Sequence, residues 1–316
     1  MEYVELRRHG YRKGLTSTEY ALNIVNILLK MVNDEKEFIR TYYVVVDKVL
    51  RERPSNMASV NILRGIGSYL LENGFNGIRD YIVGLIDKIE KACEETAIIA
   101  SHRIVEKDVL MTLSDSLCVR KMFKHLVDRD VEFEVYVLES RPGMEGLDLA
   151  DYLDKLGVKT NLVIDSAARF FVKNVKKVVV GVEALAVNGA VVGKVGTSLL
   201  SLVANEARVR VFALAPLYKL SFETIHGELL ELPEGDWSYL MDEEVRKTLP
   251  QNYSARVPVF DVTPPHLIDG IVTEYGLFAP QAIPVVLKQI YGVYPPKVES
   301  LEHIVSQIKE KWGEIR

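Results

Sequence analysis

A run of β-branched residues in the middle of the chain constrains its fold more than any other feature. Val178, Val179 and Val180 form a segment too apolar for a sheet with one solvated face, so they predict a strand covered on both faces. The strand ends at Gly181, and Glu183 then lies at the edge where open α/β sheets place their ligands. This stretch predicts a parallel strand of an α/β sheet with a binding site at its carboxyl end.

The residues that follow predict a hairpin, a helix and another strand. Asn188-Gly189 is a strong turn signal, so the chain is expected to double back in a small hairpin. Thr197 or Ser198 is then expected to cap a helix, and residues 209–213 to form the next strand. The order of strand, turn, helix and strand is that of an α/β domain.

The segment around the start of this helix has the composition of an anion site. Backbone N–H groups and the helix dipole attract an anion, and Lys194 adds a positive charge beside Gly196 and Thr197. A Gly-Thr pair at a helix start is also what a plain helix cap requires. Both interpretations stay open on these residues alone.

The first 95 residues carry a helical pattern. Residues 16–19, Thr-Ser-Thr-Glu, form a capping box, and apolar residues at helical spacing follow it. Further helices are expected at residues 35–51, 61–72 and 77–97. We therefore place an N-terminal helical domain at residues 1–95.

Beyond residue 96 short strands and helices alternate. Strands are expected at residues 97–100, 109–112, 131–138, 161–164, 177–180 and 209–213, and helices at 117–127, 147–156 and 167–171. Such alternation builds parallel sheets through right-handed crossovers. We therefore expect an α/β protein, with a Rossmann-like, mostly parallel sheet domain at residues 96–316. Residues 224–252 predict a polar surface excursion, and residues 299–312 a docked C-terminal helix.

Composition excludes several classes of function. The net charge of −5 provides no electrostatic footprint for nucleic acid, so direct nucleic-acid contact is not expected. Two cysteines, Cys93 and Cys118, in a chain of this length predict a reducing compartment, and their spacing does not suggest a zinc site. The absence of a signal-peptide pattern and of a membrane-spanning run predicts a cytoplasmic protein. No Gly-x-Gly-x-x-Gly follows the first strand, so no dinucleotide, other cofactor or metal is expected.

Three segments resemble a known family. GVEALAVNGAVVGKVGTS, DSAARFF before it and VFDVTPPHLIDGIVTEYG after it resemble the family joining the alpha, beta and delta subunits of translation initiation factor 2B with two isomerases. Those isomerases act on methylthioribose-1-phosphate and ribose 1,5-bisphosphate. The resemblance extends from about Arg53 to about Pro280. It implies the family's fold and a two-fold homodimer through the α/β domain, with higher homo-oligomers possible.

The resemblance also implies contacts with a phosphorylated ligand. Arg53 lies in a signature similar to the family's Arg-Pro-Thr/Ser, although a solvated arginine before a helix-starting proline explains it too. Arg141 matches the Glu-x-Arg-Pro loop, where a guanidinium can bind phosphate or brace the loop. Asp165 matches an Asp-Ser loop but also suits a helix N-cap. The expected ligand-binding set is Arg53, Arg141, Asp165, Asn188, Lys194, Gly196 and Thr197.

The positions that carry proton transfer in the isomerases differ here. By the resemblance, Leu113 and Ser114 match the positions of a His and a catalytic Cys in the isomerases. Glu183 matches the position of an Asp. A serine hydroxyl transfers protons only when a neighbouring base activates it. A glutamate side chain is one methylene longer than that of aspartate, and a displacement of a catalytic group by about 1 Å can reduce the rate about a hundredfold. Cys118 could replace the missing thiol, but a buried core role is favoured. The enzymes' phosphate-binding Arg-Gly-Ala segment is poorly matched by residues 10–15.

These departures favour a non-catalytic protein similar to subunits of translation initiation factor 2B. It would bind a phosphorylated sugar or nucleotide at the sheet edge, and the alpha subunit of translation initiation factor 2 or copies of itself. Ser114 and Glu183 would then be degenerate catalytic positions. The alternative is an aldose–ketose isomerase of ribose 1,5-bisphosphate or a methylthioribose-1-phosphate type substrate. A purely structural subunit with a collapsed pocket is the third possibility.

Overall fold

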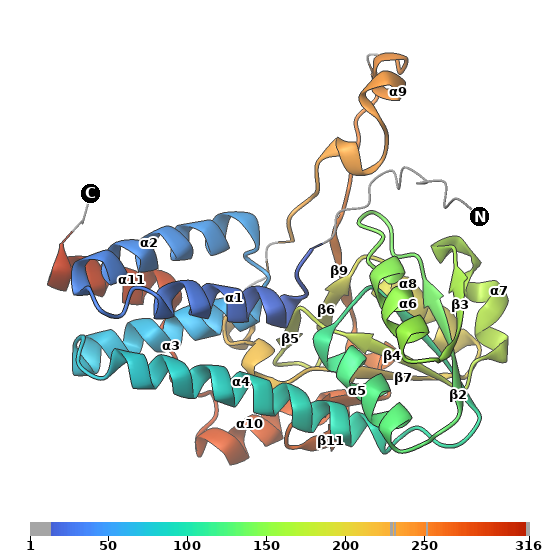
Figure 1. Ribbon diagram of the computed structural model, residues 1–316, viewed down its shortest axis with the longest axis horizontal. Coiled ribbons are helices and arrows are strands. Elements are labelled where there is room, and N and C mark those ends of the chain that lie inside the picture. Colours follow the sequence, from blue (N-terminus) through green and yellow to red (C-terminus); the bar gives the residue numbers. More distant parts are fainter. Residues whose placement is uncertain (1–13, 228–229, 231, 251, 314–316) are drawn as a thin grey trace.

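The chain folds into a group of helices beside a two-sheet α/β region (Figure 1). The computed structural model describes residues 14–227, 230, 232–250 and 252–313. None of the described helices combines the length and the apolar composition that a membrane span requires.

The helical group is built from the N-terminal part of the chain and the C-terminal helix. Its helices are α1 (Ser17–Leu29), α2 (Glu35–Glu52), α3 (Met57–Asn73), α4 (Ile78–Ser101) and α11 (Leu301–Trp312). The predicted capping box is confirmed, because the Thr16 backbone N–H donates to the Glu19 carboxylate and Thr16 Oγ1 accepts from the Glu19 N–H. The apolar stripe of α11 packs against α3, with Leu301, Ile304 and Ile308 buried. All five predicted helices exist, and their observed limits differ from the expected ones by a few residues.

The larger sheet has seven strands in the order β11-β10-β7-β4-β1-β2-β3. Every neighbouring pair is parallel except β10 and β11. The strands are β1 (Asp108–Leu113), β2 (Phe133–Leu138), β3 (Lys159–Val163), β4 (Lys177–Gly181), β7 (Arg210–Leu214), β10 (Gly270–Thr273) and β11 (Gly276–Phe278). The mostly parallel sheet predicted from the alternating pattern is therefore confirmed.

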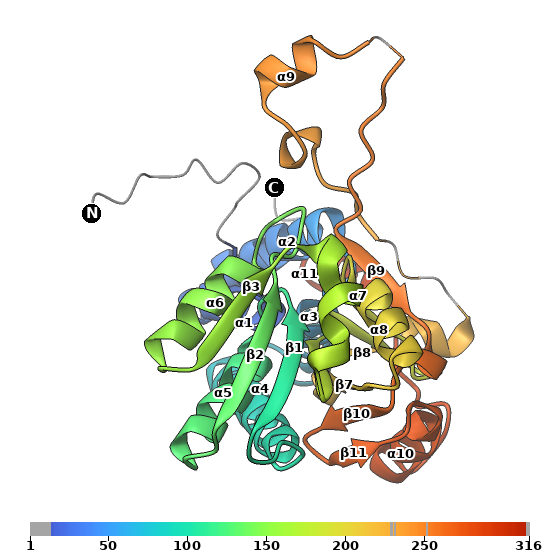
Figure 2. The same ribbon diagram turned by 90° about the vertical axis from the view of Figure 1, so that its right-hand side faces the viewer.

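Helices cover both faces of this sheet (Figure 2). One face packs on α4, α5 (Leu117–Asp128) and α6 (Gly146–Lys155), and the other on α7 (Ala168–Phe171), α8 (Thr197–Glu206) and α10 (Ile283–Tyr291). Val179 belongs to the first core and Val178 and Val180 to the second, each at most 1% exposed. The prediction of a strand covered on both faces is confirmed.

One local prediction is wrong. Residues 97–100, expected as a strand, form the last turns of α4, where Ala97 and Ala100 pack against the larger sheet and α5. Short apolar runs fit a buried helix as well as a strand, and here the helix continues through them. Because α4 extends to Ser101, the domain limit at residue 95 falls inside a helix, and the division stays a prediction.

A smaller sheet, in the order β8-β5-β6-β9, joins the helical group to the larger sheet. Its strands are β5 (Ala184–Ala186), β6 (Val191–Lys194), β8 (Leu220–Ser221) and β9 (Phe260–Thr263). β5 and β6 form the predicted antiparallel hairpin, with Asn188 Oδ1 accepting from the Ala190 N–H at 3.0 Å. Gly189 turns the chain at φ 81°, a conformation that favours glycine.

The segment between β8 and β9 projects from the body of the molecule (Figures 1 and 2). It carries the short helix α9 (Glu243–Lys247) near its tip, and all five residues of this helix are exposed. The predicted surface excursion is confirmed. We call this projection, residues 232–259, the arm.

The two cysteines are bonded to each other, whereas the sequence predicted a reducing compartment. Cys93 on α4 and Cys118 on α5 form a disulfide across the interface of these helices, with Cα atoms 5.3 Å apart. Their separation of 25 residues in the sequence does not reveal that the two helices are neighbours. Because disulfides are rare in reducing compartments, this pair removes the cysteine argument for such a compartment.

Candidate functional site

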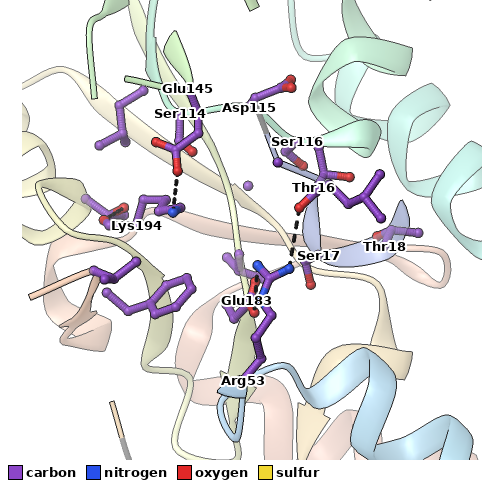
Figure 3. Close-up of a pocket in the computed structure, with 18 of the residues that line it drawn as sticks. Thr16, Ser17, Thr18, Arg53, Ser114, Asp115, Ser116, Glu145, Glu183 and Lys194 are labelled. Carbon is purple, nitrogen blue, oxygen red and sulfur yellow. Dashed lines mark hydrogen bonds and ion pairs between the residues drawn. The ribbon is translucent and has the colours of Figure 1, made fainter. Parts of the chain in front are cut away.

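A pocket of 390 Å³ lies at the carboxyl end of β1 and β4 (Figure 3). Its walls come from the residues after these two strands, the start of α1, the end of α2, the end of β6 and the base of the arm. Its size lies within the range of small-molecule sites. The pocket therefore lies at the sheet edge where the sequence places a ligand.

Glycine at the end of β4 brings the two strand ends together. A Cβ added to Gly181 would lie 2.4 Å from Cβ of Ser116, so a larger residue would push β4 and the start of α5 apart. As a result Ser114, after β1, and Glu183, after β4, line one pocket. The structure thus brings the two expected catalytic positions together.

Glu183 places a carboxylate in the wall of the pocket. Its backbone N–H donates to Val192 O at 2.8 Å, so the hairpin fixes the position of the side chain. The side chain is nearly buried, and among the described residues Oε1 accepts no hydrogen bond. Oε1 lies 3.6 Å from Nη2 of Arg53. A buried carboxylate with an oxygen free of hydrogen bonds can accept a proton from a ligand, or a hydrogen bond from one of its hydroxyl groups.

Arg53 is the C-cap residue of α2, and its side chain contacts residues at the start of α1. Its Nη1 donates to Leu15 O at 3.4 Å, and its guanidinium lies 4.7 Å from the centre of the Tyr20 ring. Figure 3 shows the guanidinium beside Glu183 and facing the pocket. Arg53 is thus not merely a solvated residue before a proline; it is a partly buried cation of the pocket wall.

Lys194 and Glu145 form an ion pair on another wall, with Nζ and Oε1 2.5 Å apart (Figure 3). Lys194 ends β6, and Glu145 precedes α6. Both side chains are mostly buried, and Nζ also lies 5.1 Å from the centre of the Phe260 ring. A phosphate that binds Lys194 must therefore compete with the Glu145 carboxylate.

Ser114 lines the pocket with its backbone in the left-handed region, at φ 60°. Its N–H donates to Ser140 Oγ at 2.5 Å, which fixes this conformation. The next residue, Asp115, forms an ion pair with Arg120, and burial raises the pKa of its carboxyl to about 7. In Figure 3 the Asp115 carboxylate points away from Lys194 and Glu183, so it is poorly placed for a ligand there.

The backbone N–H groups at the start of α8 are already occupied. Gly196 N–H donates to Asp261 Oδ2 at 2.8 Å, and Ser198 N–H to the same oxygen at 3.1 Å. Burial raises the pKa of Asp261 to about 6, an effect that these hydrogen bonds oppose. The expected cap is wrong, because Gly196 is the N-cap and Thr197 Oγ1 donates to Lys194 O at 2.5 Å. A carboxylate of the chain thus takes the place that the sequence suggested for an anion.

Three expected ligand-binding residues lie behind the walls of the pocket. Asp165 accepts from the N–H groups of Ser140 and Arg141 at 2.8 and 2.7 Å, which braces the loop after β2. Nη2 of Arg141 donates to O of Tyr239, a pocket residue on the arm, at 2.7 Å. Asn188 lies in the turn of the β5–β6 hairpin. In the structure these residues position the walls.

Lys219 is a pocket residue that the sequence analysis missed. It is 1% exposed, and its Nζ donates to Val182 O at 2.7 Å. Burial lowers the pKa of its amine to about 8, and the nearby Glu183 opposes this shift. A lone lysine inside the apolar segment at residues 209–222 was the available signal, because lysine is rarely buried without a function.

Two further expectations concern the thiol and the phosphate segment. Cys118 is bonded to Cys93, so it offers no thiol to a ligand. Residues 10–13 of the poorly matched phosphate segment lie outside the described residues, while Gly14 and Leu15 line the pocket. Among the residues that the structure describes, no group of three His, Cys, Asp or Glu side chains could hold a metal ion.

Comparisons with known proteins identify relatives over most of the chain. A family model described as the initiation factor 2 subunit family matches residues 16–280. The ribose 1,5-bisphosphate isomerase of Thermococcus kodakarensis is 33% identical over 298 residues, 92% of each chain. That of Methanocaldococcus jannaschii is 32% identical over 295 residues, again 92% of each. A solved structure of translation initiation factor eIF-2B from Pyrococcus horikoshii OT3 is 26% identical, with a TM-score of 0.72 over 86% of this chain and 95% of that one.

These relatives overturn the prediction of a non-catalytic factor. Five curated relatives that are 30 to 34% identical are named ribose 1,5-bisphosphate isomerase, which supports the alternative. The alpha subunit of translation initiation factor 2 as a partner stays a prediction. The prediction treated Ser114 and Glu183 as the loss of both proton-transfer groups. The pocket, however, keeps a buried carboxylate at Glu183 and has a buried amine at Lys219.

Proposed function

The chain belongs to the initiation factor 2 subunit family, and we propose that it is a sugar-phosphate isomerase that converts ribose 1,5-bisphosphate to ribulose 1,5-bisphosphate. One observation carries the proposal. The Glu183 carboxylate, with an oxygen free of hydrogen bonds among the described residues, lines a pocket that also holds the cations of Arg53, Lys194 and Lys219. A base surrounded by cations is what proton transfer on an anionic sugar requires.

The chemistry of the reaction defines what the pocket must supply. In ribose 1,5-bisphosphate the phosphate on C1 prevents simple opening of the ring to a free aldehyde. The bond from C1 to the ring oxygen must break, a proton must leave C2, and a proton must arrive at C1. A base near C2 and an acid near the ring oxygen are therefore needed, and we assign the base to Glu183.

Cations on two walls suit a substrate with two phosphates. Arg53 lies on the α2 side of the pocket and Lys194 on the β6 side, and we propose that each binds one phosphate. Thr197 lines the pocket beside Lys194, whereas Arg141, Asp165 and Asn188 position the walls. Ser114 lies close enough to the site to contact a sugar hydroxyl.

The direct test is product formation. Purified protein is incubated with ribose 1,5-bisphosphate, and ribulose 1,5-bisphosphate is followed by ³¹P and ¹³C NMR. We expect steady turnover by the wild type, a loss of at least about a hundredfold in Glu183→Gln, and full activity in the matched control Glu134→Gln. Glu134 is a carboxylate on β2 that pairs with Lys159, outside the pocket.

A parallel incubation with methylthioribose-1-phosphate tests the other substrate named for this family of isomerases. No product from ribose 1,5-bisphosphate, with the protein folded and at millimolar substrate, refutes the proposal. Turnover that is unchanged in Glu183→Gln refutes the assignment of the base. These two outcomes are distinguishable because the first concerns the wild type and the second only the variant.

We also propose that the chain forms a two-fold homodimer through its α/β region. Large apolar side chains that are about half exposed or more lie on α8 and on α7 and β9, both of which contact α8. They are Phe170 at 64%, Leu199 and Leu202 at 52% each, and Val262 at 49%. A soluble monomer seldom exposes such a group. Sedimentation velocity is expected to show a dimer in the wild type and a monomer in Leu199→Glu/Leu202→Glu, and a monomeric wild type at micromolar concentration would refute this.

A further inference from the structure

We propose that Lys219 is a second catalytic residue of this site, which exchanges protons with the sugar oxygens while Glu183 exchanges protons with the sugar carbons. This inference rests on the proposed isomerase function. It assigns proton exchange with the sugar oxygens to a buried amine, whereas the sequence analysis named only Ser114 at the position of the missing thiol.

Glu183 and Lys219 lie close enough for their charges to interact, and the sheet register brings their segments together. β5 and β8 are parallel, with Leu185 opposite Leu220. Lys219 therefore lies beside Ala184, one residue after Glu183, and both charged residues line the pocket. Two residues that are 36 positions apart in the sequence thus bring a carboxylate and an amine to one pocket.

Both groups keep unused hydrogen-bonding capacity. An ammonium has three N–H donors, and among the described residues Val182 O accepts from one of them at 2.7 Å. Oε1 of Glu183 accepts no hydrogen bond from any residue that the structure describes. Buried polar atoms without a hydrogen bond are unfavourable, so substrate hydroxyls that form hydrogen bonds with both groups would be bound favourably.

A structural role for Lys219 is the competing explanation. The amine could simply hold the Val182 carbonyl and pack its stem against Tyr218, whose ring centre is 6.0 Å from Nζ. A buried ammonium is an expensive way to hold one carbonyl, because desolvation of the charge costs several kcal/mol. Residues that bear such a cost are concentrated at functional sites.

The electrostatic surroundings favour reversible proton exchange. The pKa of Lys219 is lowered to about 8, because burial and, to a lesser extent, the Arg53 guanidinium lower it while the Glu183 carboxylate opposes them. The ring of Tyr218 is the remaining ionisable group against it, and burial together with Glu274 keeps that phenol neutral by raising its pKa. An amine that titrates near the working pH can act as acid and as base in one cycle.

The proton movements balance over one turnover. The Glu183 carboxylate removes the proton from C2 as the C1–C2 double bond forms and the bond from C1 to the ring oxygen breaks, and the Lys219 ammonium protonates that oxygen. The intermediate is an enol phosphate with a hydroxyl on C2. The neutral Lys219 amine then removes the proton of that hydroxyl, the C2 carbonyl forms, and protonated Glu183 delivers its proton to C1. Both residues end in their starting states, and no oxidant or reductant is needed.

The test compares Lys219→Met, Lys219→Arg and the control Lys177→Met. Lys177 is a partly buried lysine that pairs with Asp108 at the opposite end of the β4 strand, outside the pocket. With ribose 1,5-bisphosphate we expect kcat to fall about a hundred- to ten-thousandfold in Lys219→Met while KM changes only a few fold, and the control to keep its activity. Circular dichroism and thermal melting verify that each variant is folded.

The pH profile separates a catalytic role from a structural one. The wild type is expected to lose kcat above about pH 8, where Lys219 no longer protonates the ring oxygen. Lys219→Arg keeps the positive charge but cannot lose its proton, so we expect low activity and no alkaline limb near pH 8. If Lys219→Met does not fold, Lys219→Arg decides the question alone.

Two results would overturn the inference. Lys219→Met that retains activity within tenfold of the wild type, or Lys219→Arg with wild-type activity and pH profile, would assign Lys219 a structural role. In either case the wild type still makes ribulose 1,5-bisphosphate, so the proposed function survives. A wild type without product instead removes the proposed function itself.

Discussion

Replacing Glu145 by glutamine should strengthen the binding of phosphorylated sugars. Glu145 holds Lys194 in an ion pair at the pocket wall, 2.5 Å from Oε1 to Nζ. Glutamine has nearly the same shape but carries no charge. The variant therefore frees the lysine for phosphate without opening a cavity.

The gain can be estimated from the geometry. A phosphate oxygen that binds Nζ on its other side would lie roughly 5 Å from the Glu145 oxygen, the 2.5 Å of the ion pair plus one hydrogen bond. Two unit negative charges at that distance repel each other by about 3 kcal/mol at an effective dielectric constant of about 20, and by about 1 kcal/mol in water. Since the two side chains are 17% and 22% exposed, the repulsion lies between these limits. The dissociation constant should fall about five- to a hundredfold.

Isothermal titration calorimetry with ribose 5-phosphate measures this directly, because the compound carries one phosphate. Glu134→Gln is the matched control: it removes a carboxylate paired with Lys159 outside the pocket, and binding should not change. Raising the salt concentration should reduce the gain, since screening weakens the repulsion. Binding by Glu145→Gln that equals or is weaker than that of the wild type would refute the argument, and would mean that the carboxylate itself holds the ligand.

Three further predictions concern stability. Thr16→Ala removes the capping-box oxygen and should cost about 1 kcal/mol, measured by urea unfolding; an unchanged midpoint would contradict the cap. Gly67→Ala places a Cβ 2.5 Å from Ile304 and should cost about 1 to 3 kcal/mol, whereas Gly84→Ala, whose Cβ meets open space, should stabilise by about 0.5 to 1 kcal/mol; equal effects would contradict the packing of α3 on α11. The pKa of Lys219 is lowered to about 8 by burial, so between pH 8 and about 10.4 the unfolded chain binds more protons than the folded one. The unfolding free energy of the wild type should therefore rise with pH relative to Lys219→Met, and a parallel pH dependence would contradict the burial of a titrating amine.

Elements with a strong local signal could be predicted from the sequence. Val178, Val179 and Val180 specify a strand because their side chains leave no polar face for solvent. Asn188-Gly189 specifies the hairpin because Gly189 adopts a positive φ. In both cases the residue types fix the backbone, so tertiary contacts do not have to be known.

Elements without such a local signal could not be predicted from the sequence. Residues 97–100 are apolar in a helix as well as in a strand, and only the length of α4 shows that they continue it. The cap of α8 comes from Asp261, 65 positions after Gly196, so the helix start contains no hint of it. Predicting either feature requires the tertiary arrangement.

The candidate site divides in the same way. Glu183 could be placed because it follows a strand that the local pattern identifies. The partners that decide its chemistry come from elsewhere: Arg53 from the end of α2 and Lys219 from the start of β8. Long-range register, rather than any motif, brings these charges together.

The absence of a reactive thiol therefore excludes proton transfer by a cysteine, but it does not exclude the isomerisation itself. A base at C2 and an acid at the ring oxygen are the chemical requirements of the isomerisation, and neither has to be a cysteine. Glu183 and Lys219 line one pocket, carry opposite charges when ionised, and keep hydrogen-bonding capacity that the described residues do not use. If Lys219→Met and Glu183→Gln each lower turnover by about a hundredfold or more, a double variant should lose little more than either single one, because two groups that exchange protons in one cycle fail together. Additive losses would show instead that the two side chains act in separate steps.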